Sequence, residues 1–271
     1  MMNVLFAAND VVYSGLELAI YTLLSHNKDV NIYIFTMDCD IRNDQEGYGV
    51  KYNSLLDWQR NRLHKLVSYL GGGTSNLCIK DVHDLYMQYL DQSVNRYTGF
   101  TPYTALRLLA DIALPYVNEL WYFDCDVTIN GNIASYYDVY ANKNCPYAAY
   151  VTPDACDGKG EMVAGVMFMN LAIMRDQEFL KQARFNYNHN LYNYPDQCAI
   201  RDVGAPEKFP PTLGYCEKLE DCLELPLIIH YTNQIGMKIY AAKNSEVFFR
   251  KFPFLKYAQE GLALLNTINH F

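Results

Sequence analysis

The sequence predicts an α/β protein built on a mostly parallel sheet, and three observations carry that prediction. Continuous apolar stretches of strand length recur along the first half of the chain, as expected for strands covered on both faces. Stretches with the apolar spacing of amphipathic helices separate them. At the N-terminus a strand, a helix and a second strand follow one another within about 35 residues, which is the length of one βαβ unit.

The first elements show this alternation most clearly. Residues 3–8 and 31–37 are predicted strands, and a helix over residues 14–27 lies between them. A second helix is predicted over residues 51–73, with Gly71 as its left-handed C-terminal cap. The inward side chains of this second helix are expected to be Leu55, Leu56, Leu63, Leu66, Val67 and Leu70.

The later elements are less regular. A short strand over residues 77–80 is followed by a helix from Thr101, with Pro102 in its first position, and by a strand over residues 119–124. The remaining predicted elements are strands over 146–151 and 163–170, a helix over 171–192, an irregular surface stretch over 204–222 and a strand over 225–232. Because no repeat, low-complexity tract or linker interrupts this order, residues 1–271 are interpreted as one domain.

Composition narrows the classes of function. The chain has 271 residues, and 51% of them are hydrophobic, which is ample for a packed core. Its formal charge of −8 argues against non-specific binding to nucleic acid, which needs a basic surface. The eight cysteines form no CxxC pair and no zinc-site spacing, so we expect reduced thiols in a cytosolic protein. We recognise no signal peptide and no membrane-spanning run of about 20 apolar residues.

The tripeptide Asp-Cys-Asp occurs twice, at residues 38–40 and 124–126. In a strand, residues i and i+2 face the same way, so two carboxylates at its carboxyl end converge on one point. Ligands of open α/β sheets bind at that edge. Both copies follow predicted strands, but Arg107 and Asp111, one turn apart on a predicted helix, precede the second copy alone. The first copy is expected in a solvated loop, with its aspartates capping a helix.

Five separated stretches of the chain carry a resemblance to a known family. They are "MNVLFAANDVVYSGLELAIYTLL", "YTALRLLADIALPYVNELWYFDCDVTINGNI", "AGVMFMNL", "YPDQCAI" and "IIHYTNQIGMKIY". In this order, over roughly residues 3–240, they resemble the retaining, metal-dependent glycosyltransferases of family 8. That group contains the bacterial lipopolysaccharide galactosyl- and glucosyltransferases and glycogenin.

This resemblance implies a GT-A fold, which has a Rossmann-like, mostly parallel central sheet flanked by helices. It also implies transfer of galactose or glucose from a UDP-sugar to a glycan or lipid-linked acceptor, as in polysaccharide biosynthesis. Residues 1–130 would bind the sugar nucleotide, residues 131–240 would form the sugar and acceptor half, and residues 241–271 would be a C-terminal helical segment.

The resemblance further implies a metal and diphosphate site. Asp124, Asp126 and His230 would hold Mn²⁺, with Mg²⁺ as a substitute, against the diphosphate of the donor. Oxygen ligands with one imidazole suit either a manganese or a magnesium ion. Arg107 and Lys238 would be cationic contacts, and positive charge there would stabilise the departing diphosphate.

The nucleotide and the sugar would each have their own residues. The nucleotide pocket would be lined, beside Asp124, by Ala8, Asn9, Asp10 and Cys125. Asp196 and Gln197 would lie at the transferred sugar as the catalytic pair. Double displacement on a protein nucleophile and front-face attack by the acceptor would both retain the anomeric configuration, and the sequence does not choose between them.

Some positions depart from the family pattern. Asn9 replaces an acidic residue, Val163 replaces an asparagine, and Ile239 replaces a proline. These departures motivate an alternative, a non-catalytic or partner-dependent sugar-nucleotide-binding protein. A nucleotidyltransferase would share the sheet and the carboxylates, but no Gly-rich, lysine-bearing loop for a triphosphate follows the first strand.

The C-terminal segment, residues 241–271, is aromatic and amphipathic, with Arg250, Lys251 and Lys256 clustered. Packing on the core as a helix is favoured over attachment to a membrane, because three charges attract a surface only modestly. We therefore expect a cytoplasmic protein, with peripheral contact to the inner face of the membrane as the alternative for this segment.

Overall fold

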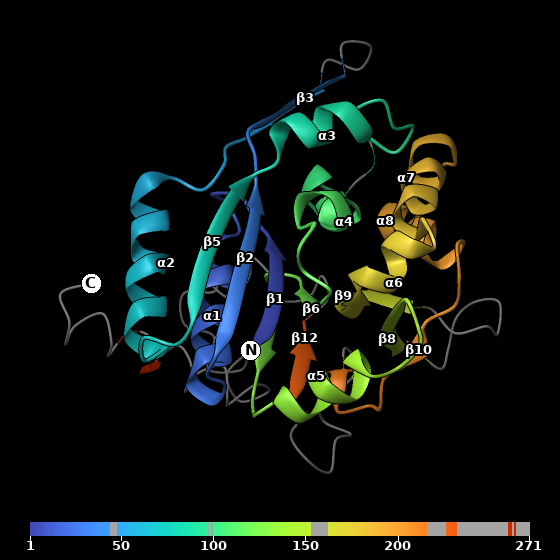
Figure 1. The fold of residues 1–271 in the computed structure, drawn as a ribbon. Coiled ribbons are helices and arrows are strands. Elements are labelled where there is room, and N and C mark those ends of the chain that lie inside the picture. The colour runs from blue at the N-terminus through green and yellow to red at the C-terminus, as the bar shows by residue number, and fades with distance from the viewer. Residues whose placement is uncertain are drawn as a thin grey trace.

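The computed structural model describes residues 1–43, 48–96, 98, 100–152, 162–215, 226–231, 260, 261 and 263. Its centre is a seven-stranded sheet with the order β10-β8-β9-β6-β1-β2-β5 (Figure 1). Its strands are β1 (Met2–Ala7), β2 (Val30–Thr36), β5 (Asn76–Asp81), β6 (Glu119–Phe123), β8 (Tyr147–Val151), β9 (Met162–Asn170) and β10 (Glu207–Lys208). In this sheet β9 runs antiparallel to its neighbours β6 and β8, and the other pairings are parallel. The predicted α/β class with a mostly parallel sheet is confirmed.

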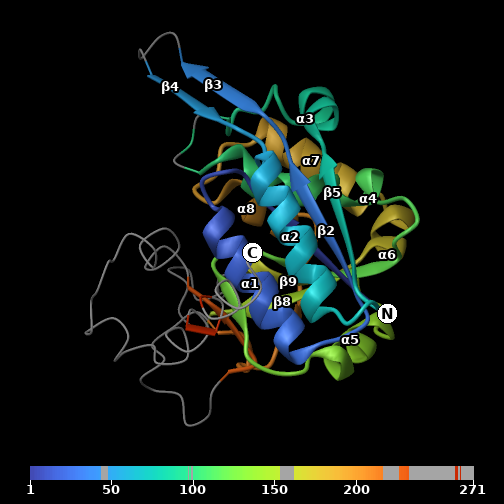
Figure 2. The same cartoon turned by 90° about the vertical axis from the view of Figure 1, so that its left-hand side faces the viewer.

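Helices cover both faces of this sheet (Figures 1 and 2). One face packs against α1 (Tyr13–His26), α2 (Asp57–Leu70) and α5 (Ala134–Ala141). The other packs against α3 (His83–Tyr89), the 3₁₀ helix η1 (Pro102–Leu109), α4 (Ala110–Ala113), α6 (Leu171–Asp176), α7 (Phe179–His189) and α8 (Pro195–Arg201). Alternation along β1 supplies both cores, because Val4 and Phe6 enter the first and Leu5 and Ala7 the second.

Two smaller sheets complete the strands. β7 (Val127–Ile129), β11 (Leu213–Tyr215) and β12 (Ile228–His230) form a three-stranded sheet in which β12 lies between the other two. β3 (Cys39–Asn43) and β4 (Tyr48–Tyr52) form an antiparallel hairpin that stands away from the body of the protein (Figure 2). The three-stranded sheet matters for function, because β12 runs antiparallel to the strand that follows the second Asp-Cys-Asp.

The helix predicted over residues 51–73 begins later than expected. Its first predicted residues belong to β4, which pairs with β3, so α2 starts at Asp57. Leu56 occupies the N-cap position and is 42% exposed, which corrects the expectation that it faces inward. The backbone N–H of Leu56 donates to Gln59 Oε1 at 2.9 Å, and this hydrogen bond fixes the start of the helix.

The end of α2 also differs by one residue from the prediction. Gly71 has a right-handed φ of −72°, and the left-handed conformation falls on Gly72, with a φ of +61°. A side chain on Gly71 would collide with Ser75 and with the carbonyl oxygen of Val67. Glycine is therefore required at Gly71 by close approach of the chain and at Gly72 by backbone conformation.

Two other predicted helices take a different form. The helix from Thr101 has Pro102 in its first position, as predicted, but its first eight residues form the 3₁₀ helix η1 before α4. The helix predicted over residues 171–192 is two helices, α6 and α7, separated by Glu178 with a φ of +51°. A residue in the left-handed region ends a helix, and this explains the break.

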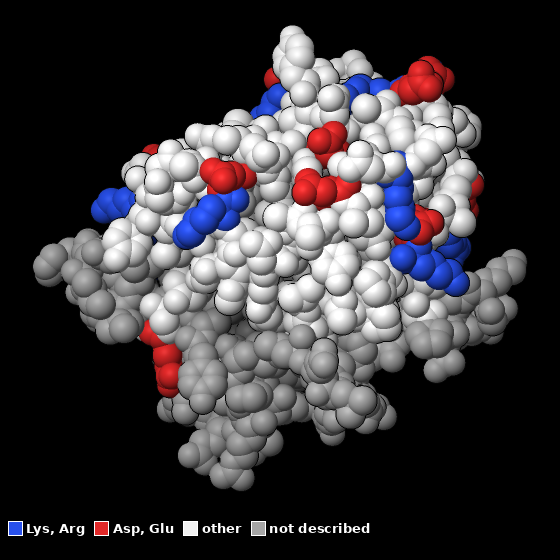
Figure 3. Space-filling model, turned by 60° about the horizontal axis from the view of Figure 1, so that its bottom comes forward, with Lys and Arg blue, Asp and Glu red and all other residues white. Residues whose placement is uncertain are grey.

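The stretch predicted to be irregular over residues 204–222 contains β10 and β11, and Leu213 is fully buried. Residues 216–222 of that stretch lie outside the described residues, as do Lys238 and most of the C-terminal segment. Among the described helices, none is long and apolar enough to cross a membrane. On the face shown in Figure 3, acidic and basic side chains lie interspersed.

Asp111 forms a buried ion pair with Arg184. Arg184 donates to Asp111 Oδ1 at 2.6 Å and to Oδ2 at 3.2 Å, and also to the carbonyl oxygen of Leu108 at 2.6 Å. Both charged residues are only 7% exposed. This pair joins α4 and α7, which contact η1 and α8, the two helices that carry the site residues described below.

We expect Asp111→Ala to lower the free energy of unfolding by about 3–5 kcal/mol, because it leaves the Arg184 guanidinium buried without a counter-charge. Urea denaturation measures this loss. The double variant Asp111→Leu/Arg184→Met removes both charges and should lose much less. A double variant as unstable as the single one would show that the pair's charge is not the cause.

Candidate functional site

The second Asp-Cys-Asp lies at the carboxyl edge of the parallel strands. β6 is parallel to β1, so Asp124 follows β6 beside the segment that follows β1. The backbone N–H of Asp124 donates to the carbonyl oxygen of Gly165 in β9 at 2.8 Å. In an open α/β sheet this edge is where ligands bind.

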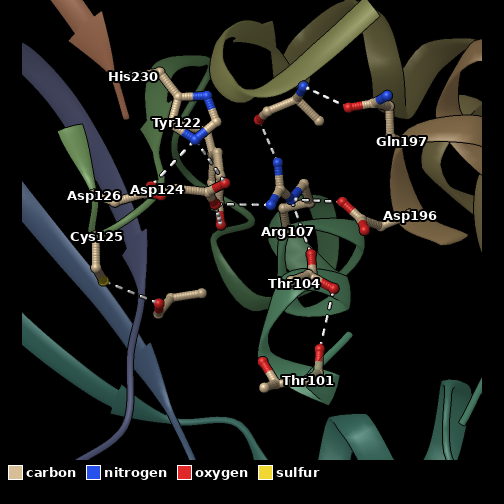
Figure 4. A network of polar contacts seen from close by, with 12 residues as sticks. Thr101, Thr104, Arg107, Tyr122, Asp124, Cys125, Asp126, Asp196, Gln197 and His230 are labelled. Atoms are coloured by element: carbon tan, nitrogen blue, oxygen red, sulfur yellow. Dashed lines mark hydrogen bonds and ion pairs between the residues drawn. The ribbon is translucent and has the colours of Figure 1, made fainter. Parts of the chain in front are cut away.

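Asp124, Asp126 and His230 come together at this edge, although about 100 residues separate the histidine from the aspartates. Pairing of β12 with β7 sets His230 opposite Val127, and the N–H of Tyr231 donates to the carbonyl oxygen of Asp126 at 2.9 Å. His230 Nε2 lies 3.1 Å from Asp126 Oδ1 and 3.7 Å from Asp124 Oδ2 (Figure 4). One ligand atom from each of the three residues lies within 4.8 Å of the others.

These three side chains fit a divalent cation. Two carboxylates and one imidazole are a donor set that Mn²⁺ accepts. The aspartate side chains are 27% and 22% exposed and the histidine 7%, so a ligand can reach the carboxylates from solvent while the imidazole stays enclosed. The fold therefore brings together the three residues that the resemblance implies as metal ligands, and together they could hold a metal ion.

Without a metal, the two aspartates favour a proton on His230. Burial by itself would lower the pKa of His230, but Asp126 and then Asp124 raise it above its ordinary value, with Arg107 opposing them. Burial by itself would raise the pKa of Asp126, and the His230 imidazolium lowers it instead. A cation entering the site would take over the position of this proton.

Arg107 lies beside Asp124 and is almost completely buried, with 2% exposure. Its Nη2 donates to Asp124 Oδ1 at 2.8 Å, its Nε lies 3.1 Å from Asp196 Oδ2, and its Nη1 donates to the carbonyl oxygen of Ala164. Burial by itself would lower the pKa of this guanidinium, but Asp124, Tyr122 and Asp196 together raise it. Arg107 is therefore a fixed positive charge whose donors are directed to the protein (Figure 4).

The 3₁₀ form of η1 helps to place this arginine. Residues i and i+3 of a 3₁₀ helix lie one above the other. Arg107 Nε accordingly donates to the carbonyl oxygen of Thr104 at 2.8 Å, and Thr104 Oγ1 donates to that of Thr101 at 3.1 Å.

Tyr122 also orients Asp124 and was not among the residues predicted from the sequence. Its hydroxyl donates to Asp124 Oδ1 at 2.8 Å, and the Arg107 guanidinium lies 4.1 Å from the centre of its ring. Because Arg107 and Tyr122 both bind Oδ1, the second oxygen, Oδ2, faces His230. The period-two alternation of β6 places Tyr122 and Asp124 on one side, and that pattern could have identified Tyr122.

Asp196 and Gln197 both come from α8 and contact the same group of residues. The pKa of Asp196 is raised by burial, against the lowering effect of Arg107. Gln197 Oε1 accepts the backbone N–H of Ala164 at 3.0 Å, while the carbonyl oxygen of Ala164 accepts Arg107. Arg107, which contacts both Asp196 and Asp124, therefore links the predicted sugar-side residues to the predicted metal ligands.

A β-bulge makes Ala164 available for this role. Between β8 and β9, Ala149 pairs with Met167 but Tyr150 pairs with Val163, so the register shifts and residues 164–166 have no partners in β8. Backbone groups that leave a ladder can bind elsewhere, and bulges often occur next to active sites. Here the freed N–H and carbonyl of Ala164 bind Gln197 and Arg107.

The predicted nucleotide-loop residues have defined surroundings. Asn9 is 2% exposed, and its Oδ1 accepts the N–H groups of Val11 and Val12 at 3.0 Å, which fixes the turn before α1. Asp10 Oδ2 accepts Asn53 Nδ2 at 3.0 Å. The side-chain oxygen of Asn9 thus binds the backbone of its own turn, whereas the carboxylate of Asp10 binds the side chain of Asn53.

Ala8 and Cys125 fix the backbone around this loop. Ala8 is fully buried, and its N–H donates to the carbonyl oxygen of Phe35 at 2.9 Å. Cys125 Sγ donates to the carbonyl oxygen of Ala7 at 3.3 Å, and burial raises the pKa of this thiol. The carbonyl oxygen of Cys125 lies so close to Gly15 that any side chain there would collide with it.

The first Asp-Cys-Asp has a different environment. Asp38 is exposed, and its Oδ1 accepts the N–H of Ser54 at 2.7 Å. Cys39 and Asp40 are the first residues of β3, where Asp40 pairs with Lys51, so the predicted loop extends only over Asp38. Among the described residues, no third ligand joins these two aspartates.

Comparison with solved structures identifies the fold. The chain is similar to the glycosyltransferase GlyE of Streptococcus pneumoniae TIGR4, with 16% identity, a TM-score of 0.59 and coverage of 95% of this chain and 64% of that chain. The chain is 13% identical to the bifunctional glycosyltransferase WbbM, with a TM-score of 0.63 and coverage of 93% of this chain and 51% of that chain. It is 14% identical to the galactosyltransferase LgtC, solved in complex with donor and acceptor sugar analogs. The TM-score is 0.61, and the match covers 92% of this chain and 100% of that chain. No family model and no curated protein matches the sequence.

The chain has the GT-A glycosyltransferase fold, as the resemblance in its sequence implied. It spans 64% of GlyE and 51% of WbbM, but the whole of LgtC. At these low identities the likeness establishes the fold, and membership of family 8 stays a prediction.

The pairing of His230 with Asp126 predicts how stability changes with pH in the metal-free protein. The raised pKa of His230 means that its contribution is complete below about pH 6.5 and is lost as the pH rises through the raised value. The lowered pKa of Asp126 means that its contribution is present above about pH 4 and is lost as the pH falls through the lowered value. We therefore expect the difference in unfolding free energy between wild type and His230→Ala, measured in EDTA, to be largest between these limits. A difference that grew toward pH 9 would contradict the pairing.

Proposed function

We propose that this protein is a metal-dependent glycosyltransferase that transfers a hexose, galactose or glucose, from a UDP-sugar to a glycan or lipid-linked acceptor, with retention of configuration. The observation that carries the proposal is the convergence of Asp124, Asp126 and His230 at the carboxyl edge of a GT-A sheet. Family 8, Mn²⁺ as the metal and polysaccharide biosynthesis as the setting are the finer parts of this proposal.

The chemistry of the site supports this choice. Cleavage of a glycosyl-phosphate bond places negative charge on the departing diphosphate, and a bound divalent cation would stabilise that charge. Asp124 Oδ2, Asp126 Oδ1 and His230 Nε2 are the atoms that would hold the ion. Without such a cation an acidic protein of charge −8 would repel the donor.

Arg107 has a different role in this proposal from the one that the resemblance implied. Its donors are directed to Asp124, Asp196, Thr104 and Ala164 rather than outward to a ligand. We infer that it acts through Asp124, by holding one carboxylate oxygen so that the other faces the metal. A direct diphosphate contact would then fall to Lys238, which lies outside the described residues.

Asp196 and Gln197 would act on the sugar side. Both lie next to Arg107 and Ala164, so the anomeric carbon of a donor bound to the metal would lie near them. Double displacement and front-face attack remain the two routes to retention. NMR of the first-formed product tests this part, and an inverted anomer would contradict both routes.

A binding protein without transferase activity is the second candidate. It is favoured by Asn9, whose side-chain oxygen binds the backbone at the place where the family carries an acidic residue, and by the apolar Val163. A cytoplasmic location and contact of the C-terminal segment with a membrane also stay predictions. Hydrolysis or transfer of UDP-sugar in the presence of Mn²⁺ distinguishes the enzyme from the binding protein.

The two Asp-Cys-Asp copies provide a matched test of the metal site. We expect Asp124→Asn, Asp126→Asn and His230→Ala each to lower kcat/KM by roughly 10²–10⁴. Each change weakens the binding of the cation that would stabilise the charge of the transition state. UDP release with a UDP-sugar donor measures the rate. Calorimetry of UDP binding in Mn²⁺ and then in EDTA should show tight binding for wild type only with the metal.

Asp38→Asn and Asp40→Asn are the controls, and we expect them to leave the rate nearly unchanged, since both side chains are exposed. Circular dichroism should confirm that every variant is folded before rates are compared. Equal UDP affinity in Mn²⁺ and EDTA, or a greater loss at Asp38 than at Asp124, would overturn the assignment of the metal site.

A further inference from the structure

The imidazole of His230 lies against a residue that has no side chain. A Cβ atom built on Gly165 would lie 2.5 Å or less from Cε1, Nε2 and Nδ1 of the His230 ring. Real Cβ atoms do not approach other atoms so closely, because repulsion rises steeply inside van der Waals contact. Any residue other than glycine at this position would displace the ring or the strand.

The His230 ring has little freedom to move aside. Its side chain is 7% exposed, and its backbone is fixed by pairing with Val127 and by the bond from Tyr231 to Asp126. β9 has little freedom to retreat either, because the carbonyl oxygen of Gly165 accepts the N–H of Asp124 at 2.8 Å. A shift of Gly165 would therefore displace a second metal ligand.

Packing also takes the place of a hydrogen bond at this histidine. A histidine that binds a metal almost always donates its second ring N–H to a carboxylate or a carbonyl, which fixes the ring. Nδ1 of His230 is buried and has no hydrogen-bond partner among the described residues. The close contact with Gly165 therefore restricts the plane of the ring, with Nε2 directed toward the aspartates (Figure 4).

We propose that Gly165 is the positioning residue of the metal centre: its missing side chain lets His230 reach the cation shared with Asp124 and Asp126. This inference rests on the proposed function, since it requires a divalent cation at these three residues. In this proposal Gly165 affects the affinity for the metal and does not itself contact the donor.

A double-mutant cycle in metal affinity tests the proposal. Mn²⁺ binding to the full chain, without donor, is measured by calorimetry for wild type, Gly165→Ala, His230→Ala and the double variant. We expect Gly165→Ala to weaken Mn²⁺ binding by about 10–100-fold, as loss of a supporting residue does. In the His230→Ala background the same change should have less than about a twofold effect, because the ring that it displaces is gone.

Thermal melting in EDTA covers the case in which Gly165→Ala alone fails to fold. The double variant should then recover the melting temperature of His230→Ala, because removal of the ring opens space for the new methyl group. Gly204→Ala is the matched control, since its Cβ would lie 3.3 Å from Phe179 Cε2, far from the metal ligands, and it should bind Mn²⁺ like wild type.

The outcomes of the Mn²⁺-binding and melting experiments separate the proposed metal site from the role of Gly165. If wild type binds no Mn²⁺, the proposed metal site fails and the role of Gly165 fails with it. If wild type binds Mn²⁺ and Gly165→Ala binds equally well, the inference alone is overturned. An equal loss with and without His230, or a double variant that stays unfolded, would likewise overturn it by showing a general structural role.

Discussion

A buried positive charge is the constraint around which this site is built. The Arg107 guanidinium has almost no contact with water, and an unpaired charge in that position would cost several kcal/mol. Its partners come from β6, α8, β9 and η1 itself, so four elements must meet at one point for the charge to be satisfied. The same requirement turns Asp124 so that only one oxygen is left for a ligand. Charge compensation in the core thereby determines the geometry of the proposed metal site.

Departures from regular structure supply the contacts that this arrangement needs. In a regular β9 the backbone groups of Ala164 would pair with β8, and in η1 residues i and i+3 lie one above the other, as Thr104 and Arg107 do. The bulge and the 3₁₀ turn thus provide carbonyl oxygens that accept hydrogen bonds from the arginine, while Asp124 and Asp196 balance its charge. Because both irregularities meet at Arg107, a change in either would disturb metal ligands and sugar-side residues together. This coupling is consistent with a site in which donor binding and catalysis use the same few side chains.

The sequence predicted much of this because its strongest signals are local. Apolar runs and helical spacing identified β1, β2, β5 and β6 and the helices α1 and α2, but not the β3–β4 hairpin or α3. The order of five motifs predicted that His230 lies beside the second Asp-Cys-Asp. What could not be predicted depends on contacts between distant segments. The break at Glu178, the bulge after Val163 and the pairing of Asp111 with Arg184 have no local signature, since each is set by tertiary packing. Likewise, no spacing rule shows that Asn9 would bind its own turn.

The two Asp-Cys-Asp tripeptides show why such context decides function. Asp38 and Asp40 follow β2, but the chain continues at once into the hairpin of β3 and β4, so one aspartate binds Ser54 and the other lies in a strand. Asp124 and Asp126 follow β6, whose neighbours β1 and β9 surround them with backbone, a buried arginine and, across β7, a histidine. The carboxylates are identical in chemistry and differ in how their negative charge is balanced. In the first copy both side chains are exposed and Asp38 accepts the N–H of Ser54, whereas in the second the protein supplies Arg107 and His230 but leaves one oxygen of each aspartate facing a common point. A cation bound at that point would complete the balance, and for this reason the second copy is the one proposed as the metal site.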